Sequence, residues 1–166
     1  MTKYSTKHFG EIDLTNIENF YEVEIQLDAK SIEITINIST ATKSIDKECI
    51  QTIDNYLTDL ENHEKNIRQI IQNDYKNGGA AKNYIDYQLE TQEDKDILGL
   101  IKNANENLDK KEKLLSVIQL LRIGFYPEKE DALFAMYDYT IQEELTDDLI
   151  VVKISKNDQH IVTIES

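Results

Sequence analysis

Histidine and cysteine are the side chains best suited to act as metal ligands, bases or nucleophiles, and this chain has few of them. The three histidines, His8, His63 and His160, fall in separate segments, and none has the i, i+4 or paired spacing of a metal site. The single cysteine, Cys49, excludes an internal disulfide and a cysteine-based zinc cluster. It follows the apolar period of its segment and has acidic neighbours, so we expect a small buried hydrophobe rather than a reactive thiol.

A glycine-containing segment at 77–82, NGGAAK, resembles a phosphate-binding loop only superficially. It lacks the spacing of a P-loop, no serine or threonine follows its lysine, and it comes after a helical pattern rather than a strand. We therefore predict a turn between helices. From the residues together we predict no catalytic side chain, no metal site and no bound cofactor.

Carboxylates are the unusual feature of the composition. The chain has 32 acidic residues against 18 basic ones, a formal charge of −14, and a pI near 4.6. Such a field repels nucleic acids and anionic lipid, so neither is expected as a partner. The acids concentrate at the two ends: residues 1–60 carry eleven acids and five bases, and 114–166 carry ten and four. The middle, 61–113, is nearly balanced with eleven and nine.

Residues 128–148 hold eight acidic side chains and a single basic one, Lys129. Tyr137 and Tyr139 add aromatic surface on one side of the same strand, and aromatic side chains are enriched at protein interfaces. We expect Asp138, Glu144 and Asp148 to lie outside the core. The candidate partner-binding residues are Tyr137, Asp138, Tyr139, Glu143, Glu144, Asp147, Asp148, Glu22, Glu24 and Glu33.

Three interpretations of these carboxylates remain open. The first is solubility alone, and the second is a docking surface for a basic protein. The third is a metal-dependent or paired-carboxylate hydrolase built from Tyr137, Asp138, Tyr139 and Glu144, which requires the carboxylates to converge in one pocket.

The elements that must position these side chains follow from the periodicity of apolar residues. Two runs at 21–28 and 31–39 alternate apolar and polar residues around a short connection, which indicates an antiparallel hairpin. From 44 to 121 the period changes to that of helices, with Ser44 as the expected first N-cap and a last helix from about Asp109 through Leu121. The remaining predicted strands are 7–14, 123–126, 132–140, 149–155 and 159–165.

This order of strands, helices and strands predicts a single α+β domain over residues 1–166. The N-terminal and C-terminal strand groups (about 7–39 and 123–165) form one antiparallel sheet, and the central helical segment (about 44–121) packs on one face. The N-terminus has no apolar stretch typical of a signal peptide, and no run is long enough to span a bilayer. The expected location is cytoplasmic, and the abundance of Ile, Asn and Lys is typical of an AT-rich bacterial genome.

Four segments, KYSTKHFGEIDL, FYEVEIQLDAKSIEITINI, LLRIGFYPE and FAMYDYTIQEELTDDLIVVKI, resemble a family of small acidic bacterial proteins, domain-of-unknown-function family 2004. The likeness is strongest at Leu120–Pro127 and Phe134–Val152. It implies no known activity and transfers no site residue. In size and acidity, such proteins resemble the immunity proteins that accompany secreted toxins. The leading hypothesis is a non-enzymatic module that binds a basic protein, in its narrow form an immunity-type inhibitor. Self-association through the hairpin 21–39 or the strand 159–165 is the other non-enzymatic alternative.

Overall fold

The computed structural model describes residues 2–129 and 131–166. Within them the helices are α1 Lys47–Leu57, α2 Leu60–Lys76, α3 Ala80–Thr91, α4 Asp94–Ile101, α5 Lys110–Ser116 and the short 3₁₀ helix η1 Pro127–Lys129. The strands are β1 Lys3–Ser5, β2 Glu11–Asp13, β3 Phe20–Leu27, β4 Lys30–Asn37, β5 Gln119–Phe125, β6 Ala135–Thr140, β7 Leu149–Ile154 and β8 His160–Glu165.

The chain folds into two compact units, each assembled from three stretches. The first contains Met1–Asn66, Arg122–Tyr137 and Lys153–His160, and the second contains Ile67–Leu121, Asp138–Val152 and Ile161–Ser166. Helix α2 and strands β5 to β8 each contribute residues to both units. The single domain over residues 1–166 stays a prediction.

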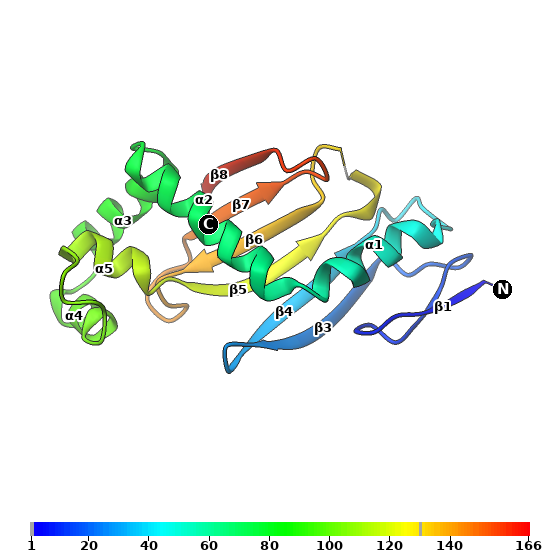
Figure 1. The fold of residues 1–166 in the computed structure, drawn as a ribbon, viewed down its shortest axis with the longest axis horizontal. Coiled ribbons are helices and arrows are strands. Elements are labelled where there is room, and N and C mark those ends of the chain that lie inside the picture. The colour runs from blue at the N-terminus through cyan, green and yellow to red at the C-terminus, as the bar shows by residue number, and fades with distance from the viewer. Residues whose placement is uncertain (1, 130) are drawn as a thin grey trace. The chain divides into compact units, whose positions relative to one another are not determined.

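The strands form a two-stranded sheet, β1–β2, and a six-stranded sheet in the order β3–β4–β5–β6–β7–β8 (Figure 1). The predicted α+β class, with a mostly antiparallel sheet and helices packed against it, is confirmed. One junction is parallel: β4 pairs with β5, and Ile34 lies opposite Ile123. Parallel neighbours need a long crossover connection. The helices α1 to α5 lie between β4 and β5 in the chain and supply this connection.

The antiparallel hairpin predicted from the alternating residues at 21–28 and 31–39 is confirmed as β3 and β4. Its connection is Asp28–Ala29, and both residues have positive φ, 49° and 62°. Two positive φ values in a two-residue loop give the twist that antiparallel strands require. The alternating isoleucines of β4, among them Ile34 and Ile36, are fully buried, so the hairpin anchors the core of the first unit.

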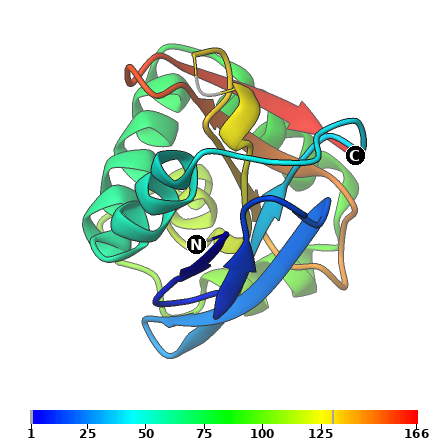
Figure 2. The ribbon, with the colours of Figure 1, turned by 90° about the vertical axis from the view of Figure 1, so that its right-hand side faces the viewer.

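The predicted continuous strand at 7–14 is wrong. Instead β1 and β2 form a small hairpin of their own, with Tyr4 opposite Ile12 (dark blue in Figure 2). The turn between them is closed by the Thr6 amide, which donates to the Gly10 carbonyl at 2.8 Å. Gly10 has φ of 72°, a conformation that glycine adopts without steric cost, and this turn interrupts the strand.

The first helix begins later than predicted. Its N-cap is Asp46 rather than Ser44. The preceding residues hydrogen-bond to the N-terminal segment, because the Ile45 amide donates to the Leu14 carbonyl and the Ile17 amide to the Lys43 carbonyl. These bonds require extended backbone and delay the helix.

The last helix begins at the predicted residue but ends early. Asp109 is its N-cap and forms a capping box with Glu112, in which each side chain accepts from the other residue's amide. The helix ends at Ser116, and the residues from Gln119 form β5. The predicted continuation of the helix to Leu121 is therefore wrong, because these residues include the start of a strand. A short apolar run fits the period of a helix as well as that of a strand.

Candidate functional site

The candidates on β6 are buried. Tyr137 and Tyr139 have no exposed surface, and Asp138 is 2% exposed. The expectation that Asp138 lies outside the core is wrong. In the sheet β6 lies between β5 and β7, so it is not an edge strand, and successive side chains on both of its faces are buried. These three side chains are therefore part of the interior and do not form a contact surface in this conformation.

The other acids of this region lie on the loop Ile141–Asp148 between β6 and β7, which we call the acidic loop. Glu143, Glu144 and Asp147 are exposed, and Asp148 is half-buried. The loop begins with a tight turn, because the amides of Leu145 and Thr146 both donate to the Gln142 carbonyl. The Asp148 amide donates to the Thr146 hydroxyl at 3.1 Å. The loop backbone is thus ordered by its own hydrogen bonds while three carboxylates face solvent.

Helix α3 holds both ends of the acidic loop through one buried tyrosine. The Tyr84 hydroxyl accepts from the Ile141 amide at 3.1 Å and donates to the Asp148 carbonyl at 3.2 Å. Burial raises the pKa of Tyr84 above its ordinary value. A phenol with the ordinary pKa is already protonated at neutral pH, and the shift extends this to more alkaline solution, so Tyr84 keeps its donor.

A second side chain of α3, Gln88, contacts the same loop. It lies one helical turn after Tyr84, so both point from one face of the helix. Its side-chain amide, fully buried, donates to the Thr146 hydroxyl at 3.3 Å and to the Asp148 carboxylate at 3.4 Å. Sequence reasoning missed both residues as determinants of the loop. The sequence signal that could have found them is the polar Gln88 one helical turn after Tyr84 on the apolar side of the helix.

We expect Tyr84→Phe to lower the free energy of unfolding by about 1–3 kcal/mol, because it leaves the buried Ile141 amide without its acceptor. Urea denaturation measures the loss, and hydrogen exchange should accelerate at the Ile141 amide. Tyr87→Phe on the exposed side of the same helix is the matched control. Equal effects of the two substitutions would contradict this role of Tyr84.

A shallow cavity of about 460 Å³ adjoins the acidic loop. It is lined by residues 143–148 and by Ser166, which directly follows β8. Ser166 therefore lies near the carboxylates of the acidic loop. Both belong to the second unit.

The acidic candidates of the first unit lie on the β3–β4 hairpin. Glu24 is directly opposite Glu33, and Glu22 is opposite Thr35, so the three carboxylates share one face of the hairpin. Glu22 and Glu24 are exposed and Glu33 is half-buried. The Ser31 hydroxyl donates to Glu24 at 2.8 Å. Like charges opposite each other are unfavourable, and a cationic group bound on this face would relieve them.

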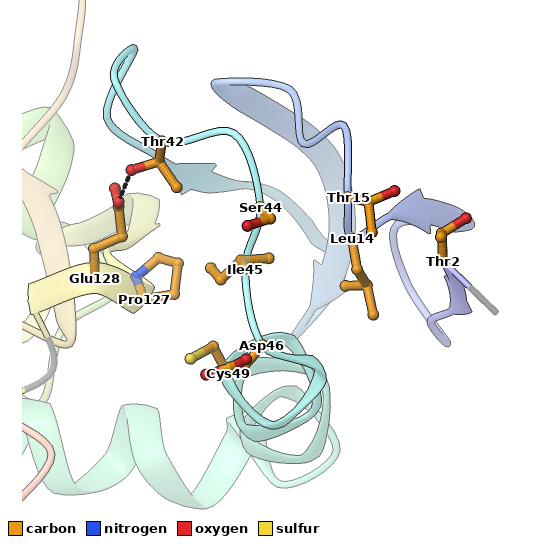
Figure 3. A pocket seen from close by; sticks show the side chains of 10 residues that line it. All are labelled: Thr2, Leu14, Thr15, Thr42, Ser44, Ile45, Asp46, Cys49, Pro127 and Glu128. Atoms are coloured by element: carbon orange, nitrogen blue, oxygen red, sulfur yellow. Dashed lines mark hydrogen bonds between the residues drawn. The ribbon is translucent and has the colours of Figure 1, made fainter.

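A cavity of about 610 Å³ lies in the first unit between the N-terminal segment, the stretch before α1, and η1 (Figure 3). Its polar lining consists of hydroxyl groups and the carboxylates of Asp46 and Glu128. Glu128 is engaged by the Ser39 amide at 2.6 Å and by the Thr42 hydroxyl. These bonds tie η1 to the segment after β4 and leave the carboxylate little capacity for chemistry.

Cys49 lies at the boundary of this cavity, near Pro127 and Glu128. Its exposure is intermediate, so the expectation of a buried position is wrong. The reason is that α1 starts at Lys47, which puts Cys49 in the first turn beside the cavity rather than inside the helix.

His8 forms a pair that sequence reasoning did not predict. Its Nδ1 lies 3.0 Å from the Asp54 carboxylate, which also accepts from the Lys7 amide. Asp54 is on α1, so the pair attaches the turn between β1 and β2 to this helix. The partners are 46 residues apart, and no sequence pattern connects them.

His63 stacks face to face on Tyr56, with ring centroids 3.7 Å apart. The Tyr56 hydroxyl is 2.6 Å from that of Tyr137, and burial raises the pKa of Tyr56 to about 12. Burial also lowers the pKa of His63 below its ordinary value of 6.5, although Asp59 and Asp158 partly oppose the shift. This aromatic cluster is a packing feature of the first unit.

The lowered pKa of His63 predicts a pH dependence. The unfolded chain takes up a proton at this histidine before the folded chain does, so its contribution to stability is present above pH 6.5 and is lost as the pH falls through the folded pKa. His63→Phe keeps a ring stacked on Tyr56 and removes the titration. We expect the stability of wild type relative to His63→Phe to decrease on acidification, measured by urea denaturation across this range. A constant difference would contradict the prediction.

Among residues 2–129 and 131–166, no group of three or more His, Cys, Asp and Glu side chains is placed to hold a metal ion. No helix of the same residues combines the length and apolarity needed to cross a bilayer.

Comparison of the chain with family models, with curated proteins and with solved structures gives no match in any of the three. The resemblance to domain-of-unknown-function family 2004 stays a prediction.

Proposed function

We propose that this chain is a non-enzymatic module that binds a basic protein through the acidic loop. The observation that supports it most is the combination of exposed Glu143, Glu144 and Asp147 with a backbone fixed by Tyr84 and Gln88. A partner that binds an ordered loop does not have to supply the entropy of ordering it.

The charge of the surrounding chain supports the same proposal. No lysine or arginine occurs between residues 130 and 152, and the whole chain carries −14. Such a field accelerates the approach of a basic partner, and the acceleration falls as salt screens it. The hairpin carboxylates Glu22, Glu24 and Glu33 are a second acidic surface, in the first unit, for the same class of partner.

An immunity-type inhibitor is the narrower form of this proposal. A toxin that cleaves nucleic acid needs a basic active site to bind phosphates, and an acidic inhibitor is complementary to such a site. A neighbouring reading frame for a basic, secreted toxin would support this form. Rescue of growth when the two genes are expressed together would test it, and continued toxicity would count against it.

The general proposal is tested by charge reversal. Glu143→Lys, Glu144→Lys and Asp147→Lys are combined in one variant. A matched variant reverses the exposed Glu18, Glu90 and Glu106 instead, which changes the net charge equally. Proteins captured from the native cell extract by wild type and both variants are quantified by mass spectrometry.

We expect wild type and the matched variant to capture the same basic protein, in amounts that fall as salt rises. The loop variant should lose it. Equal capture by all three proteins would show that the acidic loop is only a solvated surface.

A further inference from the structure

The geometry points to the outer edge of β8 as the place where an extended segment of the basic partner adds as a further strand. This inference rests on the proposed function of the acidic loop and names how the partner is bound. Strand addition at a free sheet edge is a recurrent mode of recognition, in which the main chain gives affinity and the side chains give specificity.

Strand β8 ends the order of the six-stranded sheet, with β7 as its one neighbour among the described residues. Ile161 is 63% exposed and Ile164 is 42% exposed. Residues 161–164, IVTI, carry no charge. Side chains alternate along a strand, so the two isoleucines lie on opposite faces. An added strand would cover apolar surface on both faces as well as pair with the free backbone groups.

The strand at the opposite edge of the sheet, β3, carries charged residues that protect it against pairing with another chain. Its exposed positions include Glu22 and Glu24, and charges on an edge strand discourage pairing with another chain. The uncharged stretch of β8 has no such protection, and no proline interrupts it. The two edges therefore differ in the feature that normally prevents strand addition.

The charge beside β8 identifies the occupant. The cavity that Ser166 lines is also lined by Glu143, Glu144 and Asp147. A strand lying along Ile161–Glu165 spans roughly 16 Å at about 3.3 Å per residue, and its end beside Glu165 is next to Ser166, which lines the same cavity as these carboxylates. Lysine or arginine at that end is complementary to the loop. A second copy of this chain, with a charge of −14 of its own, is the less favourable occupant.

Two synthetic peptides separate strand addition from attraction by charge. The first alternates threonine and valine and has two lysines at each end. The second is identical except that a proline, which cannot continue a ladder, replaces the central valine. Fluorescence anisotropy measures the binding of each peptide to wild type, Ile161→Glu, Glu144→Lys and the matched control Leu98→Glu. Leu98 is 56% exposed on α4.

We expect the first peptide to bind wild type and Leu98→Glu equally and Ile161→Glu about tenfold more weakly, because the contact with an anchoring apolar side chain is lost. Glu144→Lys should weaken binding mainly at low salt. The proline peptide should bind wild type at least about tenfold more weakly than the first. Hydrogen exchange at the amides of 161–165 should slow when the first peptide is bound.

Three results would overturn the inference. Equal binding of both peptides would mean that charge alone acts, which leaves the proposed function intact and removes the strand. Failure of the first peptide to bind wild type would exclude the edge, while the charge-reversal capture still judges the loop. A dimer mass in light scattering that is lost in Ile161→Glu would assign the edge to a second copy.

Discussion

Ile34→Asp should leave the chain largely unfolded at room temperature. Ile34 is fully buried, lies opposite Val23 on β3, and is paired with the equally buried Ile123 on β5. A carboxylate there is removed from water, so it must either be buried as a charge or bind a proton. The loss should exceed about 4 kcal/mol, a large part of the roughly 5–15 kcal/mol that stabilises a domain of ordinary size.

The matched control makes the same chemical change on an exposed strand. Ile161→Asp on β8 is expected to change the free energy of unfolding by less than about 1 kcal/mol. Circular dichroism and urea denaturation of both variants give the comparison. A folded Ile34→Asp protein, with a transition close to that of wild type, would show that β4 is not in the core.

Asp138→Lys is expected to be the second most damaging change, with a loss of at least about 3 kcal/mol. Asp138 lies between the fully buried Tyr137 and Tyr139 on an interior strand. A lysine there is longer than the aspartate and brings an ammonium into a position that water does not reach. This outcome replaces the sequence-based expectation that Asp138 can be reversed without harm to the fold.

Glu144→Lys is the control, because it makes a reversal of the same sign on the exposed acidic loop. It is expected to stay within about 0.5 kcal/mol of wild type, and relief of repulsion between acids favours a slight gain. Thermal or urea denaturation separates the two variants. Similar losses in both would mean that the loop is as embedded as β6.

Local patterns in the sequence determined much of the secondary structure. The alternation in 21–39 predicted the β3–β4 hairpin because a strand buried on one face requires a period of two. Asp109 predicted the start of α5 because its carboxylate satisfies an amide that the helix leaves free. The single cysteine likewise excludes an internal disulfide and a cysteine-based zinc cluster.

Features that depend on partners far away in the chain were decided by the tertiary structure alone. The crossover that makes β4 and β5 parallel joins residues about ninety positions apart, and the His8–Asp54 pair joins residues 46 apart. The start of α1 moved from Ser44 because the residues before it bond to the N-terminal segment.

The same distinction holds for the candidate site. The sequence showed that residues 128–148 are rich in acids. It did not show which of these acids lie in a buried strand and which lie in an exposed loop. Asp138 lies on the interior strand β6 and is buried there, whereas the contacts of Tyr84 and Gln88 fixed a loop from which Glu143 and Glu144 face solvent. Charge is a property of the residue and was determined by the sequence. The exposure of a side chain depends on the residues packed around it, and only the tertiary structure shows which residues these are.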